Sequence, residues 1–91
     1  MNLGLLEHFL AAYEMGSLGK AAAKLGLSQP ALSKSIRKLE AQLDLTLFHR
    51  TTKGITPTSY ADTLARRSQA IQADIRNSVA ELKSLKQGEV G

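Results

Sequence analysis

Residues 17–50 contain two short stretches with helical periodicity, and this pattern constrains the fold more than any other feature. In the second stretch, apolar side chains recur at spacings of four, three and four residues, which places them on one face of a helix. These side chains are Leu32, Ile36, Leu39 and Leu43. The opposite face carries short polar groups and cations and has no acidic side chain. Such a two-faced helix is typical of a recognition helix that enters the DNA major groove.

Capping residues predict the same arrangement. Ser17 can accept the first amide hydrogen bonds of a helix over about residues 18–25. Gly26 can end this helix, because glycine adopts the left-handed conformation without a steric penalty. Ser28 can then cap a helix over about residues 29–43. Two helices joined by such a tight turn form a helix-turn-helix.

The flanking segments complete a winged fold. A first helix is predicted over about residues 3–15. Its expected buried face consists of Leu6, Phe9, Leu10 and Tyr13. Short strands are predicted at Thr46–Phe48 and Ile55–Thr56, and the polar HRTTKG segment between them has the composition of a hairpin, or wing. Pro57 would end the second strand. We therefore expect a mainly α winged helix-turn-helix, three helices plus a two-stranded wing, over residues 1–57.

A long helix is predicted from residue 59 to about residue 87, with Thr58 as its N-cap. Its 29 or so residues would extend about 44 Å, too far to fold back on so small a domain. Small and apolar residues alternate along it at three and four residues, as in a heptad seam that pairs with another helix. They are Ala61, Leu64, Ser68, Ile71, Ile75, Ser78, Leu82 and Leu85. We predict that residues 58–87 mediate a homodimer; the alternative is that the helix packs along its own domain.

The run AAAKLGLSQPALSKSIRKLEAQL, followed by LFHRTTKGITPT, resembles the N-terminal DNA-binding domain of LysR-type transcriptional regulators. The resemblance extends from Leu3 to about Lys86. The family usually has glycine where Asp44 stands, and alanine-glycine where Tyr60 and Ala61 stand. Aspartate tolerates a left-handed turn better than most residues, so the first difference should be harmless. The second should affect only how the long helix packs at its start.

The resemblance implies a bacterial, cytoplasmic regulator of transcription. In this family the long linker helix pairs antiparallel with its counterpart in a second subunit. A C-terminal domain binds a small-molecule co-inducer, and tetramers depend largely on that domain. Residues 88–91 would be the start of the hinge to this effector domain, which is missing from the sequence.

Most of the predicted DNA contacts lie on the polar face of the second helix of the helix-turn-helix. A dimer would place two recognition helices in successive major grooves, so the operator should be an interrupted palindrome. Gln29 can make paired hydrogen bonds to adenine and Lys34 can donate to guanine, while Pro30 and Ala31 can contact thymine methyl groups. Phosphate contacts are predicted for Ser28, Ser33, Arg37, Lys38 and Arg50.

Alternatives exist for several of these side chains. Gln29 and Ser33 could be solvated helix surface, and Arg37 could pair with Glu40 three residues later. Lys53, at the tip of the wing, is predicted to enter a flanking minor groove, with general solubility as the alternative.

Composition narrows the class of protein. The net charge is +4, of which +3 lies in residues 1–57, and this favours a polyanionic partner. There is no cysteine, and His8 and His49 are isolated, so we expect no metal and no cofactor. His8 should lie on the solvent side of the first helix, and His49 near DNA phosphate.

Other classes of protein fit less well. The sequence has no nucleophile and base paired at motif spacing, so it does not indicate an enzyme. No apolar run approaches the roughly 20 residues that cross a membrane, and Glu7 argues against a signal peptide. The alternative function is a winged-helix module that binds protein or RNA and carries a coiled-coil helix, which would not need the SQPALS face.

Overall fold

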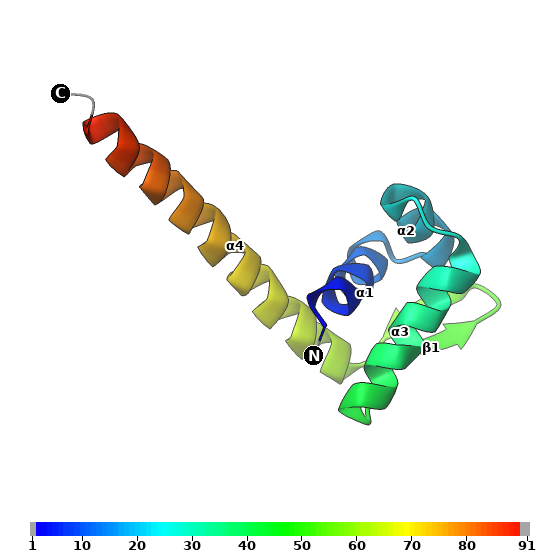
Figure 1. The fold of residues 1–91 in the computed structure, drawn as a ribbon. Coiled ribbons are helices and arrows are strands. Elements are labelled where there is room, and N and C mark those ends of the chain that lie inside the picture. Colours follow the sequence, from blue (N-terminus) through cyan, green and yellow to red (C-terminus); the bar gives the residue numbers. More distant parts are fainter. Residues whose placement is uncertain (1, 90–91) are drawn as a thin grey trace.

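A computed structural model describes residues 2–89 of the chain. Its elements follow in the order α1 (Leu3–Met15), α2 (Leu18–Leu25), α3 (Gln29–Leu43), β1 (Phe48–Thr51), β2 (Gly54–Pro57) and α4 (Ser59–Gly88). The first three helices and the hairpin form a head, from which α4 projects (Figure 1). The predicted winged helix-turn-helix followed by a long helix is confirmed. The expected hinge residue Gly88 is the last residue of α4, and Val90 and Gly91 lie outside the described residues.

The predicted caps define the helix ends. Ser17, Ser28 and Thr58 each accept a hydrogen bond from the backbone N–H three residues later, at 3.2–3.3 Å. Gly26 ends α2 in the left-handed conformation, at a φ of 70°. Asp44 ends α3 in the same conformation, at a φ of 54°, so aspartate does replace the usual glycine here.

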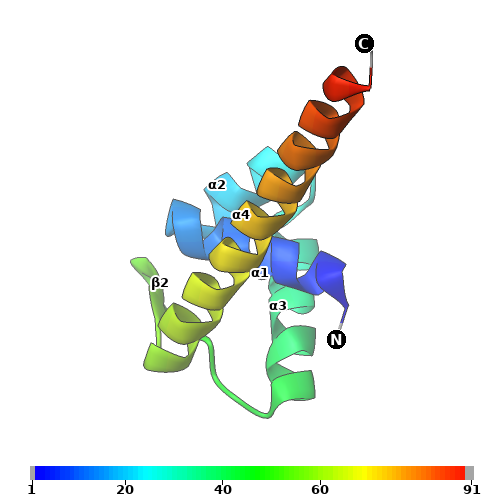
Figure 2. The same ribbon diagram turned by 90° about the vertical axis from the view of Figure 1, so that its left-hand side faces the viewer.

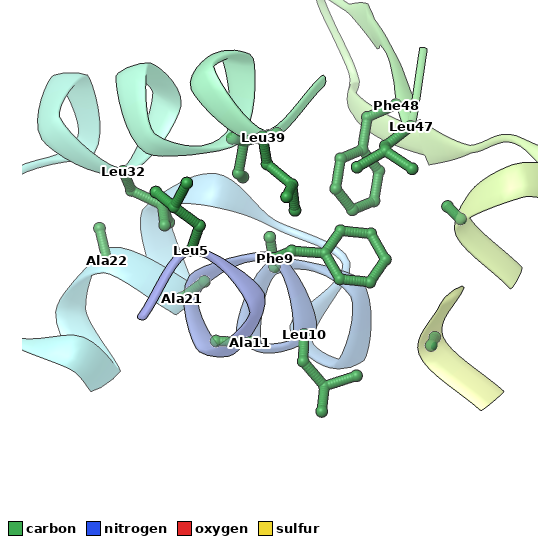
Figure 3. Close-up of a cluster of buried hydrophobic side chains, with 14 residues drawn as sticks. Leu5, Phe9, Leu10, Ala11, Ala21, Ala22, Leu32, Leu39, Leu47 and Phe48 are labelled. Carbon is green, nitrogen blue, oxygen red and sulfur yellow. The ribbon is translucent and has the colours of Figure 1, made fainter. Parts of the chain in front are cut away.

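The core lies between α1, α3 and the start of the hairpin (Figure 3). At its centre, the ring of Phe9 lies 5.5 Å from the ring of Phe48, measured between centroids. The largest fully buried side chains are Phe9, Leu32, Ile36, Leu39 and Leu47. Burial of each such side chain contributes roughly 1.5–3 kcal/mol to folding. The predicted buried face of α1 is partly wrong: Leu5 is buried, whereas Leu6 and Tyr13 are half-buried.

The first turns of α4 belong to the head. Ala61, Ala65 and Ser68 are buried there, and their small side chains let α4 cross close to α1 (Figure 2). The hydroxyl of Tyr13 donates to Asp62 Oδ1 at 2.8 Å, and this hydrogen bond raises the pKa of Tyr13 above its usual value. Both helices are therefore joined by apolar and polar contacts.

This packing corrects the start of the predicted pairing seam. Ala61 and Ser68 are buried within their own chain and Leu64 is half-buried against the core, so these residues serve the head. Over residues 69–89 no side chain of α4 is buried. Of the two family differences, Tyr60 is 56% exposed, whereas Ala61 is fully buried where α4 packs on the head.

The wing starts later than predicted. β1 and β2 pair antiparallel from Phe48 opposite Pro57 to Thr51 opposite Gly54. Thr46 and Leu47 precede the strand, because the N–H groups of Leu47 and Phe48 donate to the carboxylate of Glu40, at 2.7 and 3.3 Å. β1 thus consists largely of polar residues that we expected in the turn, whereas β2 contains the predicted strand residues Ile55 and Thr56.

Candidate nucleic-acid interface

The exposed face of α3 is cationic and polar. Lys34, Arg37 and Lys38 are exposed along it, opposite the buried stripe that holds the helix to the head. At its N-terminal end, Gln29, Pro30 and Ala31 are also exposed. The structure therefore places these six predicted DNA-binding residues on one accessible surface.

The first turn of α3 is held by its cap and by α2. Ser28 is exposed, and its Oγ accepts from the N–H of Ala31, which leaves the hydroxyl proton free for an outside acceptor. A Cβ atom on Gly19 would lie 3.4 Å from Gln29 Oε1, an ordinary contact distance, so the start of α2 lies close to the amide of Gln29. Nothing in the sequence indicated this proximity, because Gly19 looks like an ordinary helix residue.

The wing lies beside the start of the recognition helix (Figure 1). A groove of about 340 Å³ separates them, lined by Gln29, Arg50, residues 16–19 and residues 51–55. Lys53 is exposed in the two-residue turn, where its backbone N–H donates to Thr51 Oγ1 at 3.2 Å. The turn is thereby fixed while the lysine side chain can extend outward.

Arg50 lies differently from the other cations. Its side chain is half-buried, and Nη1 donates to Ser33 Oγ while Nη2 donates to the Ser33 carbonyl oxygen at 3.4 Å. Burial lowers the pKa of Arg50 and the nearby charge of Arg37 lowers it further, whereas Glu40 opposes both. Arginine remains charged at neutral pH in spite of such shifts. The prediction from sequence had assigned both Arg50 and Ser33 to phosphate and missed their contact.

The two histidines have different surroundings. His8 is half-buried, not on the solvent side as we expected, and its Nδ1 hydrogen-bonds with Ser35 Oγ at 2.7 Å. It therefore joins α1 to α3. The sequence did not indicate this contact, because the two residues are 27 positions apart. His49 is exposed on β1. In residues 2–89, no three His, Cys, Asp or Glu side chains gather as metal ligands would, and no helix is long and apolar enough to span a membrane.

Comparison with known proteins places this geometry in context. Residues 3–62 match the family described as "Bacterial regulatory helix-turn-helix protein, lysR family". The chain is 50% identical over 68 residues to the HTH-type transcriptional regulator AbaB of Streptomyces antibioticus, covering 75% of this chain and 23% of AbaB. It is 37% identical over 90 residues to the regulator XapR of Escherichia coli K12, covering 99% of this chain and 31% of XapR.

The chain thus spans less than a third of either relative. Among solved structures, it is similar to the DNA-binding domain of BenM, crystallised in complex with catB site 1 DNA. The TM-score is 0.83 at 29% identity, over 93% of this chain and 94% of the BenM chain.

Proposed function

This chain belongs to the LysR family of bacterial helix-turn-helix regulators, and we propose that it binds an interrupted palindromic operator as a homodimer to regulate transcription. The observation that carries the proposal is the exposed, cationic face of α3 beside the wing. An accessible helix with these groups can enter a major groove while the wing follows the adjacent DNA. That the similar BenM domain was crystallised with DNA supports duplex DNA as the ligand.

Within this interface, Gln29 and Lys34 read bases, and Arg37, Lys38 and Ser28 position the helix on phosphates. Gln29 lies in the N-terminal turn of α3, which a docked recognition helix points into the groove. Pro30 and Ala31 lie beside it and can contact thymine methyl groups. Charges farther along the helix meet the backbone, which gives affinity without sequence preference.

Gln29→Ala should relax the preference at one operator position. The variant loses a paired hydrogen bond to a base, which costs roughly 1–3 kcal/mol on the cognate base pair and little on others. Arg37→Ala serves as the matched control and should weaken all sequences alike while it reduces the salt slope. The measurement is a binding scan of single base-pair substitutions in a duplex that the unaltered chain selects from random sequences. A uniform loss for Gln29→Ala would assign this residue to the backbone.

Lys53→Ala should lose more affinity on A·T-rich flanks than on G·C-rich flanks. The exposed turn can carry the lysine into a flanking minor groove, where narrow A·T-rich DNA concentrates negative potential. Titrations with two duplexes that share the central site and differ only in their flanks test this. Equal losses would indicate a phosphate contact, and no loss would place the wing away from DNA.

The dimer rests on the free part of α4. Large apolar side chains are exposed there in one stripe. Because removing apolar surface from water is favourable, such a stripe is expected to pair with another helix. They are Ile71, Ile75, Val79, Leu82 and Leu85. Val79, one turn after Ile75, widens this stripe at one edge, and Ser78 of the predicted seam stays within it, with its Oγ donating to the Asp74 carbonyl oxygen.

An apolar groove of about 140 Å³ continues this stripe onto α1, between Leu3, Leu6 and Leu10 on one side and Ile71 and Ile75 on the other. Leu3 is 75% exposed at its rim. A second copy of α4 offers side chains of matching kind, so the groove extends the proposed dimer interface to the first helix. Sequence reasoning missed this part because it assigned Leu6 to the core.

The alternative, a module for RNA or another protein, makes a different prediction for binding. A DNA regulator should show strong salt dependence together with a preference for one duplex that survives moderate salt. The relatives reported above are named as transcriptional regulators. Cytoplasmic location, co-inducer binding and tetramers are properties of a full-length regulator and stay predictions here.

A further inference from the structure

Arg50 joins the wing to the middle of the recognition helix. Its guanidinium contacts both polar atoms that Ser33 presents, the side-chain Oγ and the backbone carbonyl oxygen. Ser33 lies one helical turn after Gln29 and one turn before Arg37, at the edge of the exposed face. The contact therefore lies in the middle of the proposed DNA-reading surface, between two residues with proposed roles in binding.

The contact also decides what the serine can do. A hydroxyl both donates and accepts, so a free serine can face either kind of group on DNA. Here a lone pair of Ser33 Oγ accepts a charged N–H from Arg50. This bond uses one of the two lone pairs of the oxygen and polarises the hydroxyl, so that its proton points elsewhere and becomes a better donor.

We propose that Arg50 is a positioning residue, which presents the hydroxyl of Ser33 to DNA as a hydrogen-bond donor and fixes the wing to α3. The inference rests on the DNA interface proposed above. It requires an acceptor on the DNA, either a phosphate oxygen or guanine O6, thymine O4 or the N7 of either purine, and it favours these acceptors over the exocyclic amines of adenine and cytosine. Arg50 itself need not touch DNA.

A double-mutant cycle on Arg50 and Ser33 tests this. Arg50→Gln and Ser33→Ala should each weaken binding to the selected duplex about tenfold, as expected for loss of a charge-assisted hydrogen bond. The double variant should bind no more weakly than either single one, because both changes remove the same contact. Ser33→Thr keeps the hydroxyl, so Arg50→Gln should still weaken this background about tenfold.

Salt dependence separates this role from a direct phosphate contact. If Arg50 acts through Ser33, the slope of log affinity against log salt should be unchanged in Arg50→Gln. If it neutralises a phosphate, the slope should fall by about 0.9. Lys53→Gln removes an exposed cation of the same wing that does not contact Ser33, so its slope serves as the comparison. Arg50→Lys keeps the charge without the planar fork, so it should bind nearly as weakly as Arg50→Gln.

Additive losses in the cycle, a reduced salt slope, or full binding by Arg50→Lys would each overturn the inference. Thermal unfolding of every variant identifies a loss caused by misfolding, and if Arg50→Gln does not fold, Arg50→Lys completes the cycle. If the unaltered chain selects no duplex, the proposed function itself fails. If it selects one and the cycle is additive, only the role of Arg50 fails. A Ser33→Ala loss confined to one base pair assigns the hydroxyl to a base, and a uniform loss assigns it to phosphate.

Discussion

Replacing Ile75 and Leu82 together with aspartate should convert the proposed dimer into a monomer and weaken operator binding. Both side chains are exposed in the isolated chain, at 59% and 65%, and lie on the apolar stripe of α4. Across a dimer interface, each aspartate would be buried without a partner, at a cost of about 3–5 kcal/mol per uncompensated charge. Two substitutions occur twice in a dimer, so four such charges would be buried at once. Sedimentation velocity at several protein concentrations measures the result.

The control moves the same two charges to the other side of the helix. Asn77→Asp with Ser84→Asp places each aspartate two residues farther on, about 200° around α4, where the original residues are polar and exposed. This variant should sediment as the unaltered chain does and keep its affinity for the operator. If the Ile75 and Leu82 variant also stays dimeric, the stripe has another purpose and the interface lies elsewhere.

The local sequence predicted those parts of the fold that depend on local physics. Ser17, Ser28 and Thr58 cap helices because their hydroxyl groups bind amides three residues away, and this relation is visible in the sequence itself. The apolar spacing in α3 likewise predicts its buried face, because helical geometry alone places Leu32, Ile36 and Leu39 on one side of the helix.

Features that depend on distant residues were not predictable in this way. Glu40 accepts the backbone N–H groups of Leu47 and Phe48, so Thr46 and Leu47 precede β1, which begins at Phe48. His8 is drawn into the head by Ser35, 27 residues away. In the same way, Arg50 looks like a free cation until Ser33 lies beside it.

The start of α4 shows how two sources of burial produce one pattern. The spacing of three and four residues runs from Ala61 to Leu85 without a change, although Ala61 and Ser68 are buried in the head and the large apolar residues after them are exposed. Periodicity indicates which face of a helix is apolar and carries no information about what covers it. The size of the side chains distinguishes the two parts, because small residues permit the close crossing with α1 and large ones follow it.

Phe9→Ala should destabilise the head by about 3–5 kcal/mol, the usual cost of an aromatic ring in a core. Phe9 is fully buried and lies against Phe48 at the base of the wing and against Tyr13, at centroid distances of 5.5 and 6.0 Å. Its removal leaves a cavity where α1 meets the wing, so the hairpin loses the surface that holds it beside α3. Urea unfolding, followed by circular dichroism at a fixed protein concentration, measures the change in the free energy of unfolding.

Two variants of the same helix calibrate this loss. Phe9→Leu retains most of the apolar volume and should cost clearly less than the alanine variant. Met15→Ala removes a side chain that is 36% exposed, and should change the free energy of unfolding by no more than about 0.5 kcal/mol. A loss for Phe9→Ala as small as that for Met15→Ala would mean that the head can collapse around the missing ring. The wing would then depend on Glu40 and Arg50 rather than on the aromatic contact for its position beside the recognition helix.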